Sequence, residues 1–233
     1  MPISSRELKQ HLLDAQRKLS GHQDRAGELH MSQLWLPVEQ IIHEVLNGKP
    51  VREEEFQKFY QGNVIEASVI DLLLNTPLQN VRTKVKLTAH DGLLQGEIDA
   101  VIDDSTVVEV KSVPNDQVLE EKTRDNRVVE HVFAQINCYM YYGRYRNGIV
   151  IYVSRSTGKI WTLDIRPDQM LQEKLAAKAA LVLTNKDVYE ALVAVRDANQ
   201  LHALGMAAIG GINELAQSIQ HEGGTSADER PIL

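Results

Sequence analysis

The fold is decided by residues 96–113, GEIDAVIDDSTVVEVKSV. Valine and isoleucine dominate both sides of a turn-forming Asp-Asp-Ser segment, and this pattern predicts a β-hairpin. A two-residue loop at 104–105 would place Asp99 opposite Val110, whereas a three-residue loop at 103–105 would place it opposite Glu109. In either register the carboxylates of Asp99 and Glu109 lie beside each other across the two strands.

The two neighbouring carboxylates indicate a cation site. Like charges at this separation repel each other unless a cation lies between them, and Mg²⁺ or Mn²⁺ takes oxygen ligands of this kind. Lys111 shares a strand face with Glu109, because the two residues are two apart. The alternative is that Asp99 and Glu109 simply face solvent, but aspartate is disfavoured in strands. Glu97 alternates with the apolar Ile98 and is expected to be exposed.

The motif Asp99…Glu109-Val110-Lys111 resembles the signature of the PD-(D/E)XK nuclease superfamily. The preceding Gly96-x-x-Asp99 resembles its RecB-type branch, which includes the CRISPR-adaptation exonucleases. Further segments extend the resemblance over roughly residues 56–165, in the order that the family has. These segments are Gly62-x-x-x-Glu66, His131-x-x-x-Gln135-x-Asn137-x-Tyr139 and the strand-like run 148–152.

The resemblance implies a role for each position of the motifs. Asp99, Glu109, the backbone carbonyl of Val110 and the helix residue Glu66 would hold Mg²⁺ or Mn²⁺. Lys111 and Gln135 would complete the catalytic set, with Lys111 orienting or deprotonating the attacking water and neutralising charge at phosphorus. The residues expected to bind substrate are His131, Tyr139, Arg124 and Arg127, and Tyr139 would offer a stacking face to a base.

Simpler alternatives stay open for several of these residues. In the simpler alternative, Lys111 only forms a salt bridge to Glu109 or Asp99 and has no catalytic role. Glu66 would be a helix-face carboxylate paired with a lysine rather than a metal ligand. His131 would cap or pack without touching DNA, and Tyr139 would belong to the core and its rim.

Hydrophobic periodicity predicts helices on both sides of a β-rich middle. The helices are expected over about 4–19, 31–46, 53–74, 128–142, 168–183 and 186–204. The strands are expected over 81–88, 93–102, the second half of the hairpin, 149–153 and 159–165, with a polar loop at 115–127. This order predicts an α/β fold with a central mixed sheet flanked by helices, a restriction-endonuclease-like core with extra N- and C-terminal helices. Expected domains are a helical appendage over 1–50, the nuclease core over 51–205 and a flexible tail over 206–233.

Composition narrows the class of protein further. The net charge of −7 disfavours a protein that coats nucleic acid, but residues 111–160 hold eight Lys or Arg against five Asp or Glu. A single cysteine, Cys138, excludes an internal disulfide and the four-cysteine iron–sulfur cluster of many CRISPR-adaptation nucleases. No apolar run is long enough to span a bilayer and the N-terminus lacks a signal-peptide core, so a cytoplasmic protein without membrane partners is expected.

These observations lead to one leading function and two alternatives. The leading one is a metal-dependent deoxyribonuclease, an exonuclease that acts on DNA ends or single strands. The alternatives are a restriction-type or structure-specific endonuclease and a non-catalytic DNA-end-binding subunit of a larger assembly. DNA is the expected partner, and the sequence leaves open a homo-oligomer or a partner protein in DNA repair, in recombination, or in phage or defence processing.

Overall fold

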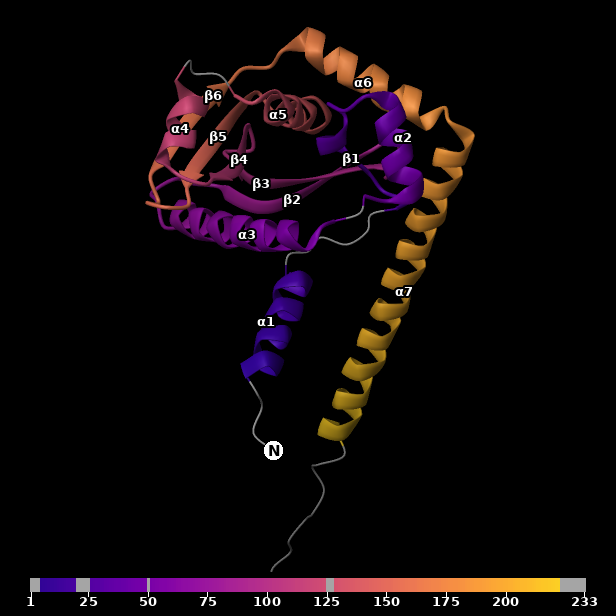
Figure 1. Cartoon of the computed structure of the whole chain (residues 1–233). Coiled ribbons are helices and arrows are strands. Elements are labelled where there is room, and N and C mark those ends of the chain that lie inside the picture. The colour runs from indigo at the N-terminus through magenta and orange to yellow at the C-terminus, as the bar shows by residue number, and fades with distance from the viewer. Residues whose placement is uncertain (1–4, 20–25, 50, 125–127, 223–233) are drawn as a thin grey trace, which may run out of the picture. The chain divides into compact units, whose positions relative to one another are not determined.

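The structure is a computed structural model in which residues 5–19, 26–49, 51–124 and 128–222 are described (Figure 1). Its helices are α1 (Ser5–Leu19), the short 3-10 helix η1 (Met31–Gln33), α2 (Val38–Asn47), α3 (Glu53–Leu74), α4 (Asp116–Thr123), α5 (Glu130–Gly143), α6 (Gln169–Leu183) and α7 (Lys186–Glu222). Its strands are β1 (Leu29–His30), β2 (Val81–Ala89), β3 (Leu94–Ile102), β4 (Thr106–Val113), β5 (Asn147–Ser154) and β6 (Ile160–Ile165). No helix in the described ranges is both long and apolar enough to cross a lipid bilayer.

The described strands form one mixed sheet of six, which confirms the predicted α/β fold. The sheet order is β1-β3-β4-β5-β6, and β2 also pairs with β3. β4 and β5 are parallel, as are β1 and β3, while the other neighbouring pairs are antiparallel. The parallel step from β4 to β5 is made through α4 and α5, as a parallel connection requires a long crossover.

Helices α3 and α5 cover opposite faces of the sheet (Figure 1). On the first face, Val69 and Ile70 of α3 pack against buried residues of β3, β4 and β5. On the second face, α5 lies so close to β5 that a Cβ at Gly148 would come within 2.4 Å of Ile136 Cγ2. The central strands are therefore covered on both sides, which explains their nearly continuous valine and isoleucine content.

Within the predicted N-terminal appendage over 1–50, residues 29–45 contribute strand and apolar side chains to the core. β1 joins the sheet in parallel with β3, which pairs Leu29 with Leu94. The buried apolar residues of this part, each at most 1% exposed, are Leu29, Met31, Leu34, Ile41 and Val45. A strand of two residues has no readable periodicity, so the sequence gives no signal for it.

Two predicted irregular regions contain helix instead. The expected loop at 115–127 holds α4, whose first turn is capped by the side chain of Asn115, an acceptor for the Val118 N–H at 3.0 Å. The expected tail from residue 206 continues α7 as far as Glu222, and residues 223–233 lie outside the described ranges. The chain divides into two compact units, 1–192 and 193–233, and the described part of the second unit is α7 from residue 193 to Glu222.

Candidate active site

Asp99 of β3 and Glu109 of β4 lie just beyond the last paired residues of these two strands. β2 pairs with β3 along its whole length, so β1 and β4 share the opposite edge of β3. The β3–β4 pairing ends at Ala100 and Val108, after which β4 continues beside β5 alone. Asp99 and Glu109 are the next residues along, and they lie where the two strands part.

The turn of the hairpin fixes which residues face each other. Strand pairing leaves a loop of three residues, 103–105. Its first two residues, Asp103 and Asp104, have positive φ values of 51° and 52°, a conformation that aspartate tolerates better than most residues. Of the two registers open from the sequence, the protein therefore has the one that places Asp99 opposite Glu109.

Both carboxylates are buried, and each is held in its own way. Asp99 is 7% exposed, and its Oδ2 accepts a hydrogen bond of 2.7 Å from the backbone N–H of Val110. Glu109 is 2% exposed, and its Oε1 accepts bonds from Lys111 Nζ at 2.5 Å and from Gln135 Nε2 at 2.9 Å. Glu109 Oε2 is buried without a hydrogen-bond partner among the described residues.

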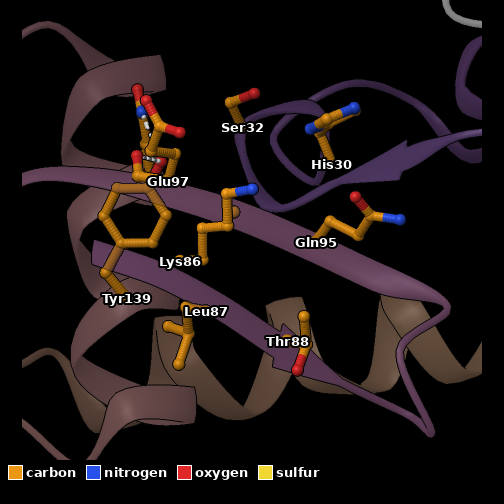
Figure 2. Close-up of a pocket in the computed structure, with 10 residues that line it drawn as sticks. His30, Ser32, Lys86, Leu87, Thr88, Gln95, Glu97 and Tyr139 are labelled. Carbon is orange, nitrogen blue, oxygen red and sulfur yellow. Dashed lines mark hydrogen bonds between the residues drawn. The ribbon is translucent and has the colours of Figure 1, made fainter. Parts of the chain in front are cut away.

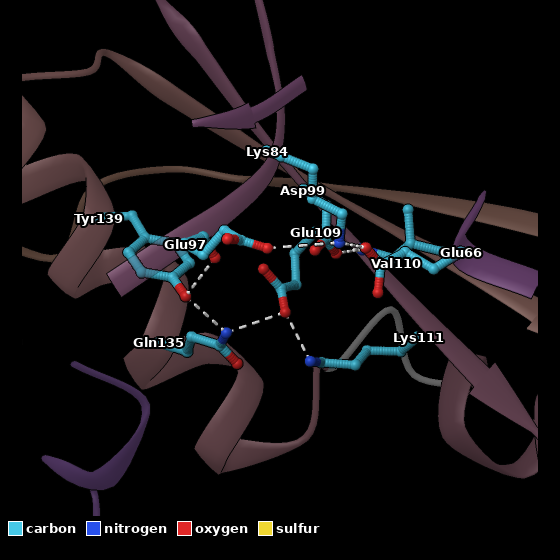
Figure 3. Close-up of polar contacts among 9 residues, drawn as sticks. All are labelled: Glu66, Lys84, Glu97, Asp99, Glu109, Val110, Lys111, Gln135 and Tyr139. Carbon is cyan, nitrogen blue, oxygen red and sulfur yellow. Dashed lines mark hydrogen bonds and ion pairs between the residues drawn. The ribbon is translucent and has the colours of Figure 1, made fainter. Parts of the chain in front are cut away.

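Helix α5 supplies the side chains that support Glu109. Gln135 and Tyr139 lie about one helical turn apart on α5. The Gln135 amide donates to Glu109 Oε1 and to the Tyr139 hydroxyl, and that hydroxyl donates to the backbone carbonyl of Glu97, each at 2.9 Å (Figure 3). The side chain of Tyr139 is 2% exposed, as expected for the alternative that it belongs to the core, and it also lines the cavity described below. Its hydroxyl fixes the position of Gln135.

Glu66 lies on α3 beside the same site, and its carboxylate is paired with a lysine. Lys84 of β2 donates to Glu66 Oε1, and its ammonium lies 3.5 Å from Glu97 Oε1 (Figure 3). The side chain of Glu66 is 18% exposed, whereas those of Lys84 and Glu97 are about half exposed. Glu97 is thus exposed as predicted, and Glu66 has the lysine partner that the sequence left open as the alternative.

Burial changes the proton affinities of the central groups. Burial, and after it the negative charges of Glu109 and Glu66, raises the pKa of Asp99 to about 8. Burial also raises the pKa of Glu109, although Lys111 opposes this shift. For Lys111, burial acts to lower the pKa, but the charge of Glu109, its hydrogen bond to Lys111 and the charges of Asp99 and Glu66 together outweigh burial, and the pKa lies above its usual value. At neutral pH Lys111 is therefore an ammonium, whereas Asp99 keeps its proton until a cation or a higher pH removes it.

A cavity of about 340 Å³ opens beside this network (Figure 2). Its wall includes His30 and Ser32 from the N-terminal segment and Lys86 from β2, as well as Glu97 and Gln135 from the site. The cavity therefore joins the carboxylate network to a wall that carries a lysine, a histidine and a hydroxyl. Such groups donate hydrogen bonds to anions such as phosphate.

Gly96 is required where β3 passes beneath α5 and η1. A Cβ at this position would lie 2.8 Å from Tyr139 Cε1 and 3.0 Å from Met31 Sδ. Any side chain would therefore push Tyr139 away from the hydrogen bonds that it makes. The glycine of the Gly96-x-x-Asp99 motif serves this close approach of backbone and ring.

Of the remaining predicted substrate residues, His131 and Arg124 make no hydrogen bond to the site among the described contacts. His131 is exposed at the start of α5, with its ring 5.6 Å from that of Trp35. Partial burial of its ring, and after it the positive charge of Lys111, lowers the pKa of His131. Arg124 is exposed at the end of α4, and Arg127 lies outside the described residues.

Asn137 has a structural role in the same motif of α5. It is fully buried, and its Oδ1 accepts hydrogen bonds from the Asp168 backbone N–H at 2.9 Å and from Gln172 Nε2 at 3.3 Å. Its amide nitrogen donates to the Phe133 carbonyl at 3.0 Å. Asn137 thus ties α5 to the beginning of α6, and alternate positions of one helical motif serve the site and the fold.

The donor set around Asp99 and Glu109 fits a hard divalent cation. A buried carboxylate oxygen without a partner is costly, and Glu109 Oε2 is such an atom. A divalent ion bound by carboxylate oxygens would satisfy it. Within the described residues, no group of three or more His, Cys, Asp or Glu side chains is assembled as a ready-made metal site, and Glu66 contacts Lys84.

Sequence reasoning missed Lys84, Lys86 and His30. The alternation of polar and apolar residues along 81–88 predicts that Lys84 and Lys86 face solvent, and nothing local links Lys84 to a glutamate 18 residues earlier. His30 reaches the cavity only because β1 joins the sheet. A cluster of basic residues on one strand, Arg82, Lys84 and Lys86, is the one signal that the sequence offered.

Comparisons with known proteins agree on the fold. No protein-family model matches the chain, and no curated protein matches it significantly. Among solved structures, the crystal structure of an alkaline exonuclease (LHK-Exo) from Laribacter hongkongensis is similar at a TM-score of 0.55 and 13% identity, over 76% of this chain and 96% of that one. The same exonuclease in complex with dAMP gives a TM-score of 0.55 at 15% identity and the same coverage. The crystal structure of SSO0001 gives 0.52 at 16%, over 76% of this chain and 87% of that one. The chain therefore shares its fold with an alkaline exonuclease.

Proposed function

We propose that this protein is a metal-dependent deoxyribonuclease that hydrolyses phosphodiester bonds, most readily at DNA ends or in single strands. The single observation that carries the proposal is the buried pair Asp99 and Glu109, with an unpartnered Glu109 oxygen and the ammonium of Lys111 beside it. A buried pair of carboxyl groups with perturbed pKa values is a feature of functional sites rather than of stable cores. The PD-(D/E)XK resemblance and the exonuclease fold both support it.

The metal in this proposal is Mg²⁺ or Mn²⁺, held by Asp99, Glu109 and the Val110 carbonyl, with Glu66 as a further carboxylate. When bound, the ion would act as a Lewis acid on the scissile phosphate and lower the pKa of the attacking water. The carboxylate oxygens of Asp99 and Glu109 favour such a hard ion over a soft metal, because carboxylates bind hard cations preferentially. With a single cysteine in the chain, an iron–sulfur cluster on four cysteines is not part of the proposal.

In this proposal Lys111 acts as a positive charge beside the scissile phosphate and does not remove a proton from the attacking water. Its raised pKa keeps it an ammonium at neutral pH, so it is suited to orient the attacking water and to stabilise the charge that develops on phosphorus oxygens. Gln135 holds Glu109 from the opposite side at 2.9 Å and is itself fixed by Tyr139. This chain of contacts keeps the carboxylate in place while a substrate enters.

The cavity beside the site supports action at a DNA end. Its volume of about 340 Å³ is within the range of small-ligand pockets, and Lys86 and Ser32 offer donors for a phosphate, whereas His30 Nε2 is paired with Glu28 Oε2 at 2.9 Å. A terminal nucleotide in this cavity would lie next to Glu97 and Gln135, which border the carboxylate pair. His131, together with Arg124 and Arg127, would contact the continuing strand.

The test is cleavage of end-labelled single-stranded, linear duplex and closed circular DNA. We expect release of short products from linear DNA with Mg²⁺ or Mn²⁺, none in EDTA, and slower action on closed circles. Cleavage in EDTA would refute the metal mechanism. Discrete cuts in closed circular duplex would support the endonuclease alternative, and DNA binding without cleavage under either ion would support the non-catalytic subunit.

A further inference from the structure

Lys84 has an unusual backbone conformation in the middle of a regular strand. Its φ is 51°, in the left-handed region, although the flanking residues Thr83 and Val85 pair normally with β3. For a residue with a long side chain this conformation is costly, and it persists only where the surroundings enforce it. The register of β2 and β3 places Lys84 at the level of Asp99, between the flanking pairs.

The ammonium of Lys84 lies among the carboxylates of the site. It contacts Glu66 Oε1 from α3 and lies 3.5 Å from Glu97 Oε1 of β3 (Figure 3). Lys84 thus links two elements that border Asp99, and its positive charge offsets part of the negative charge gathered there. The neighbouring Arg82 forms an ordinary surface pair with Asp104 at 2.7 Å, and both of these side chains are more than half exposed.

The two lysines of the site contact different carboxylates, and each contacts one oxygen, Oε1. The other oxygen of Glu109 is buried without a partner among the described residues, so an ion that binds there leaves the contact of Lys111 in place. Lys84 offsets the charge of Glu66, and a divalent ion at the site would attract that same carboxylate. A metal and Lys84 would compete for Glu66.

We propose that Lys84 is an internal counter-cation that holds Glu66 while the site contains no divalent ion and releases it when the ion binds. The inference rests on the proposed metal-dependent function and adds a regulatory element to the same site. Lys84 sets the concentration of divalent metal at which Glu66 joins Asp99 and Glu109. Its half-exposed side chain has room to move into solvent when displaced.

The test measures Mn²⁺ binding by the full chain without DNA, by calorimetry and by the EPR signal of free Mn²⁺. Lys84→Met removes the charge, and Lys84→Gly removes it while accepting the left-handed backbone without strain. Both variants should bind Mn²⁺ about two- to fivefold more tightly, the range expected for a half-exposed ion pair. Both should also show a larger rise in melting temperature on adding Mn²⁺ to the metal-free protein.

Two controls separate this mechanism from a general charge effect. Arg82→Met removes a cation from the same strand and should leave Mn²⁺ affinity unchanged. In a Glu66→Gln background, Lys84→Met should no longer tighten binding, because the carboxylate for which the two cations compete has lost its charge. Persistence of the gain in that background would show that Lys84 acts on the field of the whole site and would overturn its assignment to Glu66.

The outcomes also distinguish this inference from the proposed function. Unchanged or weaker Mn²⁺ binding in both Lys84 variants, with normal binding in the wild type, would refute the counter-cation alone. A failure of wild type and variants alike to bind Mn²⁺ at millimolar concentration would refute it together with the metal site. Tight Mn²⁺ binding without DNA cleavage would refute the nuclease and leave the result for Lys84 intact.

Discussion

The raised pKa of Asp99 predicts that metal binding depends steeply on pH. A divalent ion binds the ionised carboxylate, so a proton must leave whenever Asp99 is protonated. With the pKa of Asp99 at about 8, the apparent affinity should rise about fifty-fold between pH 6 and pH 8, and only about twofold more by pH 9. The raised pKa of Glu109 would steepen this dependence at the acidic end.

The assay is calorimetric titration of the metal-free protein with Mn²⁺ in two buffers of different ionisation enthalpy. The difference between the buffers counts the protons released, which we expect to be about one at pH 7 and close to none at pH 9. Asp99→Asn should bind weakly and release fewer protons. Asp103→Asn, in the exposed turn of the same hairpin, is the matched control and should behave as wild type. An affinity that is constant from pH 6 to pH 8, with no protons released, would refute the reasoning.

Three further predictions concern catalysis and stability. Lys111→Met should lower single-turnover cleavage by at least ~10²-fold while DNA affinity measured by anisotropy stays near wild type, and normal cleavage would reduce Lys111 to a salt-bridge partner. Gly96→Ala should lower the unfolding free energy by about 1–3 kcal/mol, because its Cβ would lie 2.8 Å from Tyr139. Gly62 is a helical residue whose Cβ would have its nearest contact at 3.9 Å, so Gly62→Ala should raise the unfolding free energy by up to about 1 kcal/mol. Equal melting temperatures of the two variants would contradict both expectations. In EDTA, the stability that protonated Asp99 provides is complete below about pH 4 and is lost as the pH rises to about 8. Urea unfolding should therefore show that the wild type loses about 2–3 kcal/mol of unfolding free energy relative to Asp99→Asn between pH 6 and pH 9. Parallel plots of unfolding free energy against pH for the two proteins would show that the pKa of the Asp99 carboxyl is not raised.

The close pairing of Asp99 with Glu109 was predictable because it depends on local geometry. Side chains in a hairpin alternate with period two, and a short turn allows few registers, so two carboxylates ten positions apart in the sequence come together. The choice between the two registers needed the structure, since it depends on positive φ values in the turn. The spacing of Gln135 and Tyr139 on one helix stripe was equally readable, but their burial depended on what packs against that stripe.

The sequence by itself determined the central hairpin, the helices α3 and α5, and the pair of carboxylates with Lys111, because each follows from periodicity or from spacing along one element. Only the tertiary structure decided that β1 enters the sheet, that Glu66 meets Lys84, and that Tyr139 is buried against Gly96. These features join segments that are distant in the chain. Side-chain periodicity records which face of an element is apolar, but it does not record which other element covers that face.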